Sequence, residues 1–381
     1  MDSLVPRHDY ATVVEAVYLN QASLGLIPVE SIDVMARHLT GTAQHGNLHM
    51  TDEQEIRILD GLRQAGAAVL GTSPECVAVL GGASAGLVTA ARLVPGGGVV
   101  LVPTDFPSVT YPWLVPAGPD CPHRTVTWVD DTPARDLTDA LIEATRPGVA
   151  VVCVSAVMYA TGSRIDAARL AAHAHTVGAR LILDATQLAG AGPVDMTGWA
   201  ADAVVTSGYK WLSGHGGVAL LAVAPDLLEV FPPQPGWMAT EGPFTFDALH
   251  LRPARGARRF EQSTIAYASA LGLTRSAARL NALGHERIQA HARRLADELV
   301  ETVEPLGWRP YRRLDDPSAS PHIVALRHPT LDAAAVQRRL QSEHRVVTSA
   351  RLGAVRISLH VYNDSSDIGA LADALAPIGR G

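Results

Sequence analysis

The chain contains a single lysine, Lys210, although Lys and Arg together number 31 among its 381 residues. A codon bias toward arginine would explain why lysine is scarce, but not why one lysine remains. Arginine cannot replace an amine nucleophile, because its guanidinium stays protonated while a desolvated lysine can lose its proton and attack a carbonyl. Lys210 is therefore the first candidate for a chemical role.

A carboxylate, Asp184, directly follows the apolar run Leu181-Ile182-Leu183. In open α/β sheets ligands bind outside the carboxyl ends of the strands, so Asp184 is well placed to meet a cofactor. An aspartate beside a pyridine nitrogen keeps that nitrogen protonated, and the ring can then withdraw electrons from a carbanion. Gln187 could donate a hydrogen bond to a phenolic oxygen of the same ring. The alternative for Asp184 taken alone is a helix N-cap.

Three further segments follow apolar runs. The segment Ser207-Gly208-Tyr209-Lys210-Trp211-Leu212 would bring Lys210 to the same sheet edge as Asp184. The segment Gly81-Gly82-Ala83-Ser84-Ala85-Gly86 joins a strand to a helix that begins near Ser84, and its backbone donors and hydroxyl could form a phosphate cradle. In the third segment, Asp105-Phe106-Pro107-Ser108, Phe106 could lie over a flat ring. Tight packing of the glycines and an ordinary core position for Phe106 are the alternatives.

Amphipathic helices alternate with short apolar runs from about residue 50 to residue 225. This pattern predicts an α/β fold with a mostly parallel sheet covered by helices on both faces. The predicted strands are 76–80, 98–102, 149–154, 180–183, 203–206 and 218–223. The predicted helices between them are 52–70, 135–145 and 167–177.

The pattern changes after the Pro/Gly-rich stretch 231–243, where a long helical region follows at about 264–303. Strands near 322–326 and 355–359 and a helix after Asp364 predict a smaller α+β unit. We therefore expect a large domain at residues 16–255 and a small domain formed by residues 1–15 and 256–381.

Composition excludes several classes of partner. The net charge is −7 and no run of basic residues is present, so nucleic acid is not an expected partner. The polar N-terminal residues do not resemble a signal peptide, and the apolar stretch 149–157 is too short to span a bilayer. We expect a cytoplasmic protein without a membrane partner. The three cysteines, with Cys76 and Cys153 in apolar strand-like runs, support neither a disulfide framework nor a metal site.

Five segments, in this order, resemble motifs of the class V aminotransferase family of fold type I pyridoxal-phosphate enzymes, which includes cysteine desulfurases, kynureninases and isopenicillin-N epimerase. They are Tyr18-Leu19-Asn20-Gln21-Ala22-Ser23, Ala83-Ser84, Asp184-Ala185-Thr186-Gln187, Ser207-Gly208-Tyr209-Lys210-Trp211-Leu212 and Arg356-Ile357-Ser358-Leu359-His360-Val361-Tyr362-Asn363. The resemblance covers nearly the whole chain. It implies a large domain with a sheet of the seven-stranded type, and pyridoxal 5′-phosphate held as a Schiff base on Lys210.

The resemblance also implies roles for other residues. The residues implied to hold the cofactor phosphate are Ala83, Ser84, Ser207 and Tyr209. Thr264 is implied to reach the phosphate of a neighbouring subunit, and the protein is then a homodimer with shared active sites. Arg356 is expected to bind the substrate carboxylate through a bidentate pair, the alternative being a solvated strand arginine. The predicted substrate-binding set also contains Asn20, Ala22 and His215.

The chain departs from the family pattern at several positions. Tyr209 and Phe106 stand where desulfurases carry histidine and look more like kynureninase, as does Tyr159-Ala160-Thr161-Gly162. His215 stands where the family often has proline, and its role is left open. The loop at 347–353 contains no cysteine, although a desulfurase needs a thiolate there to accept sulfur.

Two functions compete. In a lyase, Lys210 exchanges its imine for the substrate amine and removes the α-proton, and the carbanion expels a β-leaving group such as a thiolate. The expected substrate is then a cysteine S-conjugate, as for similar cysteine-less relatives in ergothioneine and lincosamide pathways. In an aminotransferase, the same carbanion is reprotonated on the cofactor. Epimerisation and decarboxylation of an amino acid also remain open. A non-catalytic regulatory module that binds the cofactor is disfavoured, since no DNA-binding segment is appended.

Overall fold

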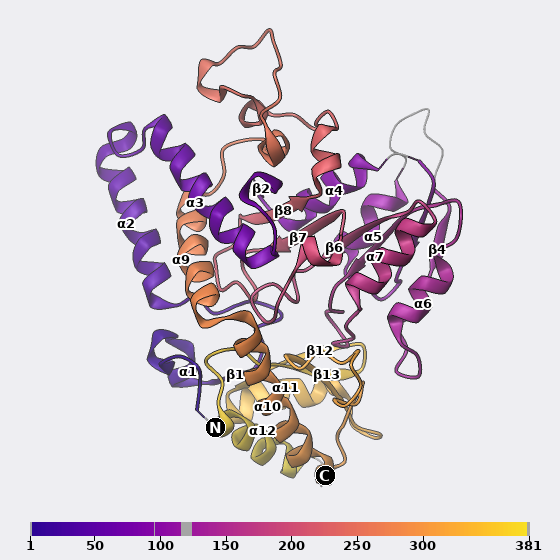
Figure 1. The fold of residues 1–381 in the computed structure, drawn as a ribbon. Helices are drawn as coiled ribbons and strands as arrows, with labels where there is room; N and C mark the ends of the chain where they lie inside the picture. The colour runs from indigo at the N-terminus through magenta and orange to yellow at the C-terminus, as the bar shows by residue number, and fades with distance from the viewer. Residues whose placement is uncertain (1, 95, 116–123, 379–381) are drawn as a thin grey trace.

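A seven-stranded sheet forms the centre of the molecule (Figure 1). The computed structural model describes residues 2–94, 96–115 and 124–378. The strand order of this large sheet is β2-β8-β7-β6-β5-β3-β4. Its strands are β2 (Val77–Leu80), β3 (Gly98–Leu101), β4 (Val126–Trp128), β5 (Val149–Ser155), β6 (Arg180–Asp184), β7 (Ala203–Ser207) and β8 (Ala219–Val223). All neighbouring pairs are parallel except the two that β8 makes, so the predicted mostly parallel sheet is confirmed.

Burial explains why these segments form strands. Every residue of β2, β7 and β8 is buried, as expected for strands covered on both faces, which need continuous apolar runs. The six predicted strands are all present, with small shifts at their ends. The seventh strand, β4, was not predicted, because it is short, lies at the sheet edge and exposes two of its three residues.

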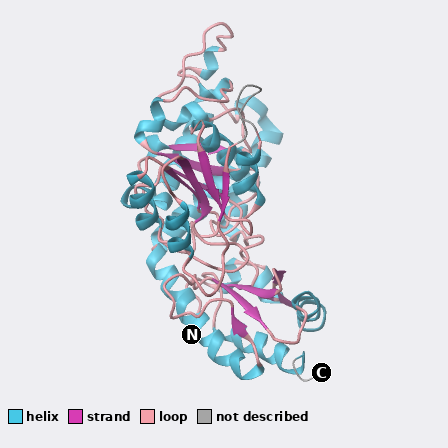
Figure 2. Ribbon diagram, turned by 90° about the vertical axis from the view of Figure 1, so that its right-hand side faces the viewer, coloured by secondary structure: helices cyan, strands magenta, loops and turns pink. Residues whose placement is uncertain are grey.

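Helices lie on both faces of the large sheet (Figure 2). Those that alternate with its strands are α3 (Asp52–Leu70), α4 (Ala83–Leu93), α5 (Pro107–Leu114), α6 (Leu137–Ala144), α7 (Ala167–Thr176) and α8 (Met196–Trp199). The helix predicted at 52–70 coincides with α3, because Thr51 and Gln54 form a capping box at its start and Gly71 ends it in the left-handed conformation. The helices predicted at 135–145 and 167–177 correspond to α6 and α7.

The long helical region predicted at 264–303 is two helices. The first, α9 (Tyr267–Leu283), ends at Gly284, whose φ of 83° interrupts the helix, and α10 (His285–Val303) follows. α9 packs against α3 and against α2 (Val29–His45), while α10 packs against α12 (Ser365–Ile378). The division of the chain between residues 255 and 256 remains a prediction.

A four-stranded sheet forms the smaller α+β part, in the lower half of Figure 1. Its strand order is β12-β13-β10-β9, and all three pairs are antiparallel. The strands are β9 (Arg309–Pro310), β10 (Ile323–Arg327), β12 (Ser349–Arg351) and β13 (Ala354–Ser358). β10, β13 and α12 correspond to the predicted elements of this part. The helix α11 (Ala333–His344) was not predicted, and a parallel pair of β1 (Val17–Tyr18) and β11 (Val346–Val347) ties the N-terminal segment to it.

Short helices complete the described chain. They are α1 (Thr12–Glu15), η1 (Arg7–Asp9), η2 (Gly46–Leu48), η3 (Pro74–Cys76), η4 (Pro225–Glu229), η5 (Trp237–Ala239), η6 (Pro243–Thr245), η7 (Gly256–Phe260) and η8 (Glu304–Leu306). Cys76 thus ends a 3-10 turn instead of lying in a strand, while Cys153 lies within β5 as predicted. Cys121 lies outside the described residues.

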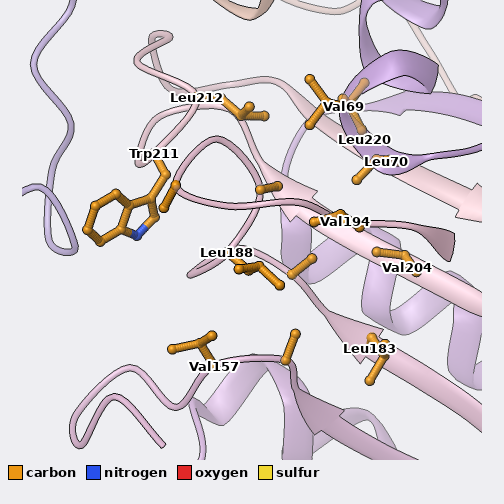
Figure 3. Packing of buried hydrophobic residues seen from close by; sticks show 14 of the residues in the cluster. Val69, Leu70, Val157, Leu183, Leu188, Val194, Val204, Trp211, Leu212 and Leu220 are labelled. Carbon is orange, nitrogen blue, oxygen red and sulfur yellow. The ribbon is translucent and has the colours of Figure 1, made fainter. Parts of the chain in front are cut away.

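The largest buried cluster lies between the large sheet and the helices on one of its faces. Figure 3 shows part of it, with Leu183 of β6 and Val204 of β7 on neighbouring strands and Leu70 of α3 near Leu220 of β8. Separate clusters cover the other face and the small sheet. Among the described residues, no helix is long and apolar enough to cross a membrane.

Candidate active site

One cavity opens where β6 and β7 end and α4 begins. Both residues predicted to be catalytic, Asp184 and Lys210, line it. Six residues predicted to bind the cofactor also line it, namely Ala83, Ser84, Phe106, Gln187, Ser207 and Tyr209. The structure places Asp184 and Lys210 at the same edge of the sheet, as the sequence predicts. Their catalytic roles remain predictions.

Lys210 lies in a buried turn three residues beyond the end of β7, with a relative exposure of 7%. Burial lowers the pKa of its ammonium from 10.5 to about 8, and the charges of Arg356 and Arg351 act in the same direction. The carboxylate of Asp184 opposes the shift. A lysine whose neutral form is abundant near pH 8 is suited to attack a carbonyl or to accept a proton.

The N-terminal segment holds the Lys210 turn through its backbone. Gln21 Nε2 donates a hydrogen bond to the carbonyl oxygen of Lys210 at 2.8 Å, and Gln21 Oε1 accepts one from the Tyr362 hydroxyl at 2.8 Å. The Gly25 N–H donates to the carbonyl oxygen of Tyr209 at 2.9 Å. A Cβ at Gly25 would lie 2.1 Å from the Lys210 carbonyl oxygen, so a side chain here would displace the turn.

Asp184 is the last residue of β6 and is 5% exposed. Its Oδ1 accepts a hydrogen bond from the Thr186 N–H at 2.8 Å. Burial raises the pKa of this carboxyl, while the Thr186 hydrogen bonds and the Lys210 charge act to lower it. A buried carboxylate is stabilised most by a cationic partner, and a protonated ring nitrogen is a partner of that kind.

Asp105 fixes the loop that carries Phe106. Its Oδ1 accepts hydrogen bonds from the Phe106 N–H at 2.7 Å and the Ser155 hydroxyl at 2.6 Å, and its Oδ2 accepts one from the Ser155 N–H at 2.8 Å. Burial raises the pKa of Asp105 to about 7. The Phe106 ring meets the Tyr159 ring edge-on, and its centroid lies 5.3 Å from Lys210 Nζ. A flat ring bound near Lys210 would therefore meet the Phe106 side chain.

The cavity also contains hydrogen-bond donors without a partner in the described part of the chain. No side chain caps the N-terminus of the eleven-residue helix α4. The Ser207 hydroxyl is buried and has no hydrogen-bond partner among the described residues. The hydroxyls of Ser84 and Ser108 lie 2.7 Å apart. A helix N-terminus together with a buried, unpartnered hydroxyl is a favourable site for a phosphate group.

Gln187 is held from two sides. Its Nε2 donates to the Ala22 carbonyl oxygen at 3.1 Å, and its Oε1 accepts a hydrogen bond from Trp211 Nε1 at 2.7 Å. The carbonyl oxygen of Gln187 lies 2.6 Å from His322 Nε2. A primary amide carries two N–H donors, so a second one remains for a phenolic oxygen in the cavity.

Arg356 of β13 is 1% exposed and lies beside the cavity wall. Its Nη1 donates to the Tyr159 carbonyl oxygen at 2.7 Å, and its Nη2 donates to the Ser23 hydroxyl at 2.5 Å. Its Nε is buried and has no hydrogen-bond partner within the described chain. Burial lowers the pKa of Arg356 to about 9, and no carboxylate is among the causes of that shift. A buried, incompletely bonded guanidinium suits a carboxylate ligand.

Besides Arg356, which lies behind Tyr159, four predicted residues do not line the cavity of this chain. Asn20 forms a bridge with Ser358, and Ala22 contacts the site through its carbonyl oxygen. Thr264 is exposed, and so is His215, whose Nδ1 lies 3.2 Å from the Ser269 hydroxyl. The roles predicted for all four remain predictions.

Four residues at or beside the cavity are not predicted as site residues from the sequence, namely Asp105, Ser155, Tyr159 and Gln21. A signal was available for two of them, because Asp105 and Ser155 end or closely follow apolar strands just as Asp184 does. Tyr159 was noted only as part of a motif. The contact between Gln21 and Lys210 joins residues 189 positions apart, so no local pattern could reveal it.

Residues 17–371 match the family model described as Aminotransferase class-V. The chain belongs to this family. Class V aminotransferases are pyridoxal-phosphate enzymes, so the chain is an enzyme that uses this cofactor. The resemblance drawn from the five sequence motifs is thus confirmed.

Two curated relatives span most of this class V chain. It is 26% identical over 329 residues to an uncharacterized aminotransferase, YcbU, of Bacillus subtilis (strain 168), with 85% of each chain covered. It is 27% identical over 404 residues to a probable hercynylcysteine sulfoxide lyase of Mycobacterium tuberculosis (strain CDC 1551 / Oshkosh), with 98% of this chain and 93% of the relative covered.

A solved structure shares the fold. The complex of the cystine C-S lyase C-DES with its reaction product, cysteine persulfide, has a TM-score of 0.84 at 20% identity, with 96% of this chain and 99% of that chain covered. The predicted fold class, that of the fold type I enzymes, is therefore confirmed.

The residues present fit pyridoxal 5′-phosphate. The uncapped α4 and the unpartnered Ser207 hydroxyl would hold the phosphate, and Asp184 would face the ring nitrogen. Phe106 would contact the ring, and Lys210 would reach the aldehyde carbon. The N-terminus of α4 and the Ser207 hydroxyl lack a side-chain partner within the described chain, and a phosphate group would supply one.

Proposed function

We propose that this class V enzyme is a C–S lyase that eliminates the sulfur substituent from a cysteine S-conjugate. The observation that carries the proposal is the backbone between β12 and β13. Arg351 pairs with Ala354, so only Leu352 and Gly353 form the connecting turn. Both residues have positive φ, 45° and 73°, as in the tight two-residue turns of β-hairpins. A hairpin this short leaves no loop that could carry a mobile cysteine to the substrate.

The described cysteines also lack the properties of a sulfur acceptor. Cys153 is fully buried within β5, and burial raises the pKa of its thiol well above the ordinary range. Cys76 is buried before β2 and does not line the cavity. The thiolate is the nucleophilic form of cysteine, so a buried thiol is a poor sulfur acceptor. Because neither described cysteine is suited to accept sulfur, we expect the sulfur to leave together with its own substituent.

The balance of the proposed reaction is simple. The Cα–H and Cβ–S bonds break, a Cα=Cβ bond forms, and the sulfur leaves as a thiol carrying its substituent. The released enamine hydrolyses to pyruvate and ammonia. When bound, pyridoxal phosphate supplies an electron-withdrawing ring that stabilises negative charge at Cα.

Three residues of the chain serve this reaction. Lys210 Nζ takes the proton from the substrate Cα, for which its lowered pKa of about 8 suits it. The carboxylate of Asp184 keeps a proton on the ring nitrogen by its opposite charge. The guanidinium of Arg356 orients the substrate by binding its α-carboxylate.

A relative named as a probable hercynylcysteine sulfoxide lyase, matched over 98% of this chain, supports the choice of a C–S bond. A place in secondary metabolism of the ergothioneine or lincosamide type is part of the same proposal and rests on the sequence resemblance alone. The uncharacterized aminotransferase among the relatives keeps transamination as the alternative, since that reaction needs the same three residues.

The test is to replace Cys76, Cys121 and Cys153 together by serine or alanine and to incubate the folded variant with a panel of S-substituted cysteines. Thiol, pyruvate and ammonia released in equal amounts at the wild-type rate are expected. A persulfide trapped on any cysteine of the wild-type protein would contradict the proposal. So would a stoichiometric keto acid that retains the sulfur substituent, which is the product of transamination.

We further propose that the enzyme works in the cytoplasm as a homodimer and that the cofactor forms a Schiff base with Lys210. The exposure of Thr264, away from the cavity of its own chain, supports a role in a neighbouring subunit.

A further inference from the structure

A second arginine lies on the same face of the β12–β13 hairpin as Arg356. In the register of the two strands, Ser349 lies opposite Arg356 and Arg351 lies opposite Ala354. Side chains alternate between the faces of a sheet, and directly opposed residues share a face. Ser349, Arg351 and Arg356 therefore project to the same side, with Arg351 as the diagonal neighbour of Arg356.

No carboxylate of the described residues neutralises the charge of Arg351. No ion pair joins Arg351 to a carboxylate of the described residues, and its Nη1 donates to the carbonyl oxygen of Ala350 at 2.7 Å. The side chain is exposed. Its charge nevertheless acts on the site, since it contributes to the lowered pKa of both Lys210 and Arg356.

Ser349 provides an independent observation on the same face. The residue is 6% exposed, and its hydroxyl is buried without a hydrogen-bond partner among the described residues. A buried hydroxyl without a partner carries a desolvation cost that a bound acceptor would remove. Besides Arg356, this face of the hairpin thus carries the Arg351 guanidinium, which has no ion-pair partner among the described residues, and the unpartnered Ser349 hydroxyl.

The tight turn fixes the position of Arg351. Leu352 and Gly353 form the two-residue turn that sets the strand register, and Arg351 is the last paired residue before it. The guanidinium is therefore attached to a rigid hairpin whose other strand carries Arg356. Two arginines on one face of a hairpin give specificity for a ligand that carries two matching negative charges.

We propose that Arg351 and the Ser349 hydroxyl bind a second anionic group of the substrate, a carboxylate at the end of its sulfur substituent. Arg356 binds the α-carboxylate, and the two arginines hold the substrate at both ends. This inference rests on the proposed function and narrows its substrate class to cysteine S-conjugates with an acidic substituent.

Binding of an unreactive ligand pair tests the inference without turnover. 3,3′-Thiodipropionate is the deamino analogue of S-(2-carboxyethyl)cysteine, and its monoamide has the same shape with one charge fewer. Their affinities for the cofactor-loaded enzyme are measured by calorimetric titration, for wild type and for Arg351→Gln. The control is Arg338→Gln, which removes the same charge from an exposed position of α11.

The dicarboxylate is expected to bind wild type about ten times or more as tightly as the monoamide, as a charge-assisted hydrogen bond predicts. Arg351→Gln should abolish that preference, Arg351→Lys should restore part of it, and Arg338→Gln should leave it unchanged. Arg356→Lys should weaken both ligands. An unchanged preference in Arg351→Gln, or an equal loss for both ligands, would overturn the inference.

Turnover then separates this inference from the lyase proposal. S-(2-carboxyethyl)cysteine and its amide are compared for thiol release. If neither yields thiol while the dicarboxylate preference persists, the lyase proposal fails and the second anion site stands. If both release thiol equally well in wild type and in Arg351→Gln, the lyase proposal stands and the second anion site is wrong.

Discussion

At the scale of single residues, burial and the charges around Lys210 set its pKa and therefore its reactivity. Burial lowers the lysine pKa, and two arginines reinforce that effect while Asp184 opposes it. The site thus places a nucleophilic amine beside a carboxylate and an unpaired guanidinium. The residue types alone predicted the amine and the carboxylate, because only one lysine is present and Asp184 ends an apolar strand. That Arg351 lies on the same face as Arg356 could be recognised only from the register of the hairpin.

Capture of the cofactor by the cofactor-free protein should report the lysine pKa. The amine must be neutral to attack the aldehyde, so the rate rises with pH as Lys210 loses its proton. The midpoint is expected at about 8 rather than at the ordinary 10.5. Stopped-flow absorbance across this range measures the rate. A rate that is still far from its plateau at pH 10 would show that Lys210 is not desolvated.

Replacement of Asp184 by asparagine should separate cofactor binding from chemistry. The phosphate contacts persist, so the cofactor content of the purified variant should remain near that of wild type. Exchange of the substrate α-proton into deuterated water should slow by orders of magnitude, because the ring nitrogen is no longer kept protonated. Proton exchange followed by NMR at equal cofactor occupancy checks this. Exchange at the wild-type rate would show that Asp184 does not keep the ring nitrogen protonated.

At the scale of elements, long buried strands were predictable and contacts between distant segments were not. The central strands are continuous apolar runs, which carry a strong local signal. The edge strand β4 and the helices α2 and α11 lack such a signal, since each exposes much of its surface. Residues 20–25 hold the Lys210 turn through hydrogen bonds between segments that are distant in the sequence. The motif around Asn20 therefore predicts that this segment belongs to the site, but not which contacts it makes.

Substitution of Gly25 by alanine should disturb the site through the backbone of Lys210. The added Cβ would lie 2.1 Å from the Lys210 carbonyl oxygen, so the turn must move. The cofactor-linked absorbance should fall, and the rate of α-proton exchange should fall about tenfold or more, because even a small displacement of a reacting group slows a reaction strongly. Gly369→Ala in α12 is the control, since nothing lies within 4 Å of its new Cβ. Equal behaviour of the two variants would show that the Gly25 contact does not position Lys210.

At the scale of the whole molecule, the site lies where the large sheet meets the smaller part of the chain. Lys210 and Asp184 come from the large sheet, whereas Arg356 comes from β13 of the small one. Substrate that contacts all three would therefore join the two parts. Thr264 is exposed and lies outside this cavity, which fits the role proposed for it in a neighbouring subunit.

Subunit mixing tests the shared site. Lys210→Ala removes the amine of a chain's own site, and Thr264→Ala is expected to weaken the phosphate contact in its neighbour. In a mixed dimer, one site carries both changes and the other carries neither. Random mixing of the two variants should thus give about a quarter of wild-type activity from the mixed dimers, in addition to the activity that Thr264→Ala retains. No activity above the sum of the separate variants would mean that Thr264 serves its own chain or has no role.

The most direct test of the account is to locate the covalent cofactor link. Wild-type protein loaded with pyridoxal phosphate is reduced with borohydride, digested and analysed by mass spectrometry, alongside Lys210→Ala. One stable cofactor adduct is expected, on the peptide that contains Lys210, and none is expected in the variant, because the chain has no other lysine. A reducible adduct that persists in Lys210→Ala, or that maps to another site in wild type, would contradict it.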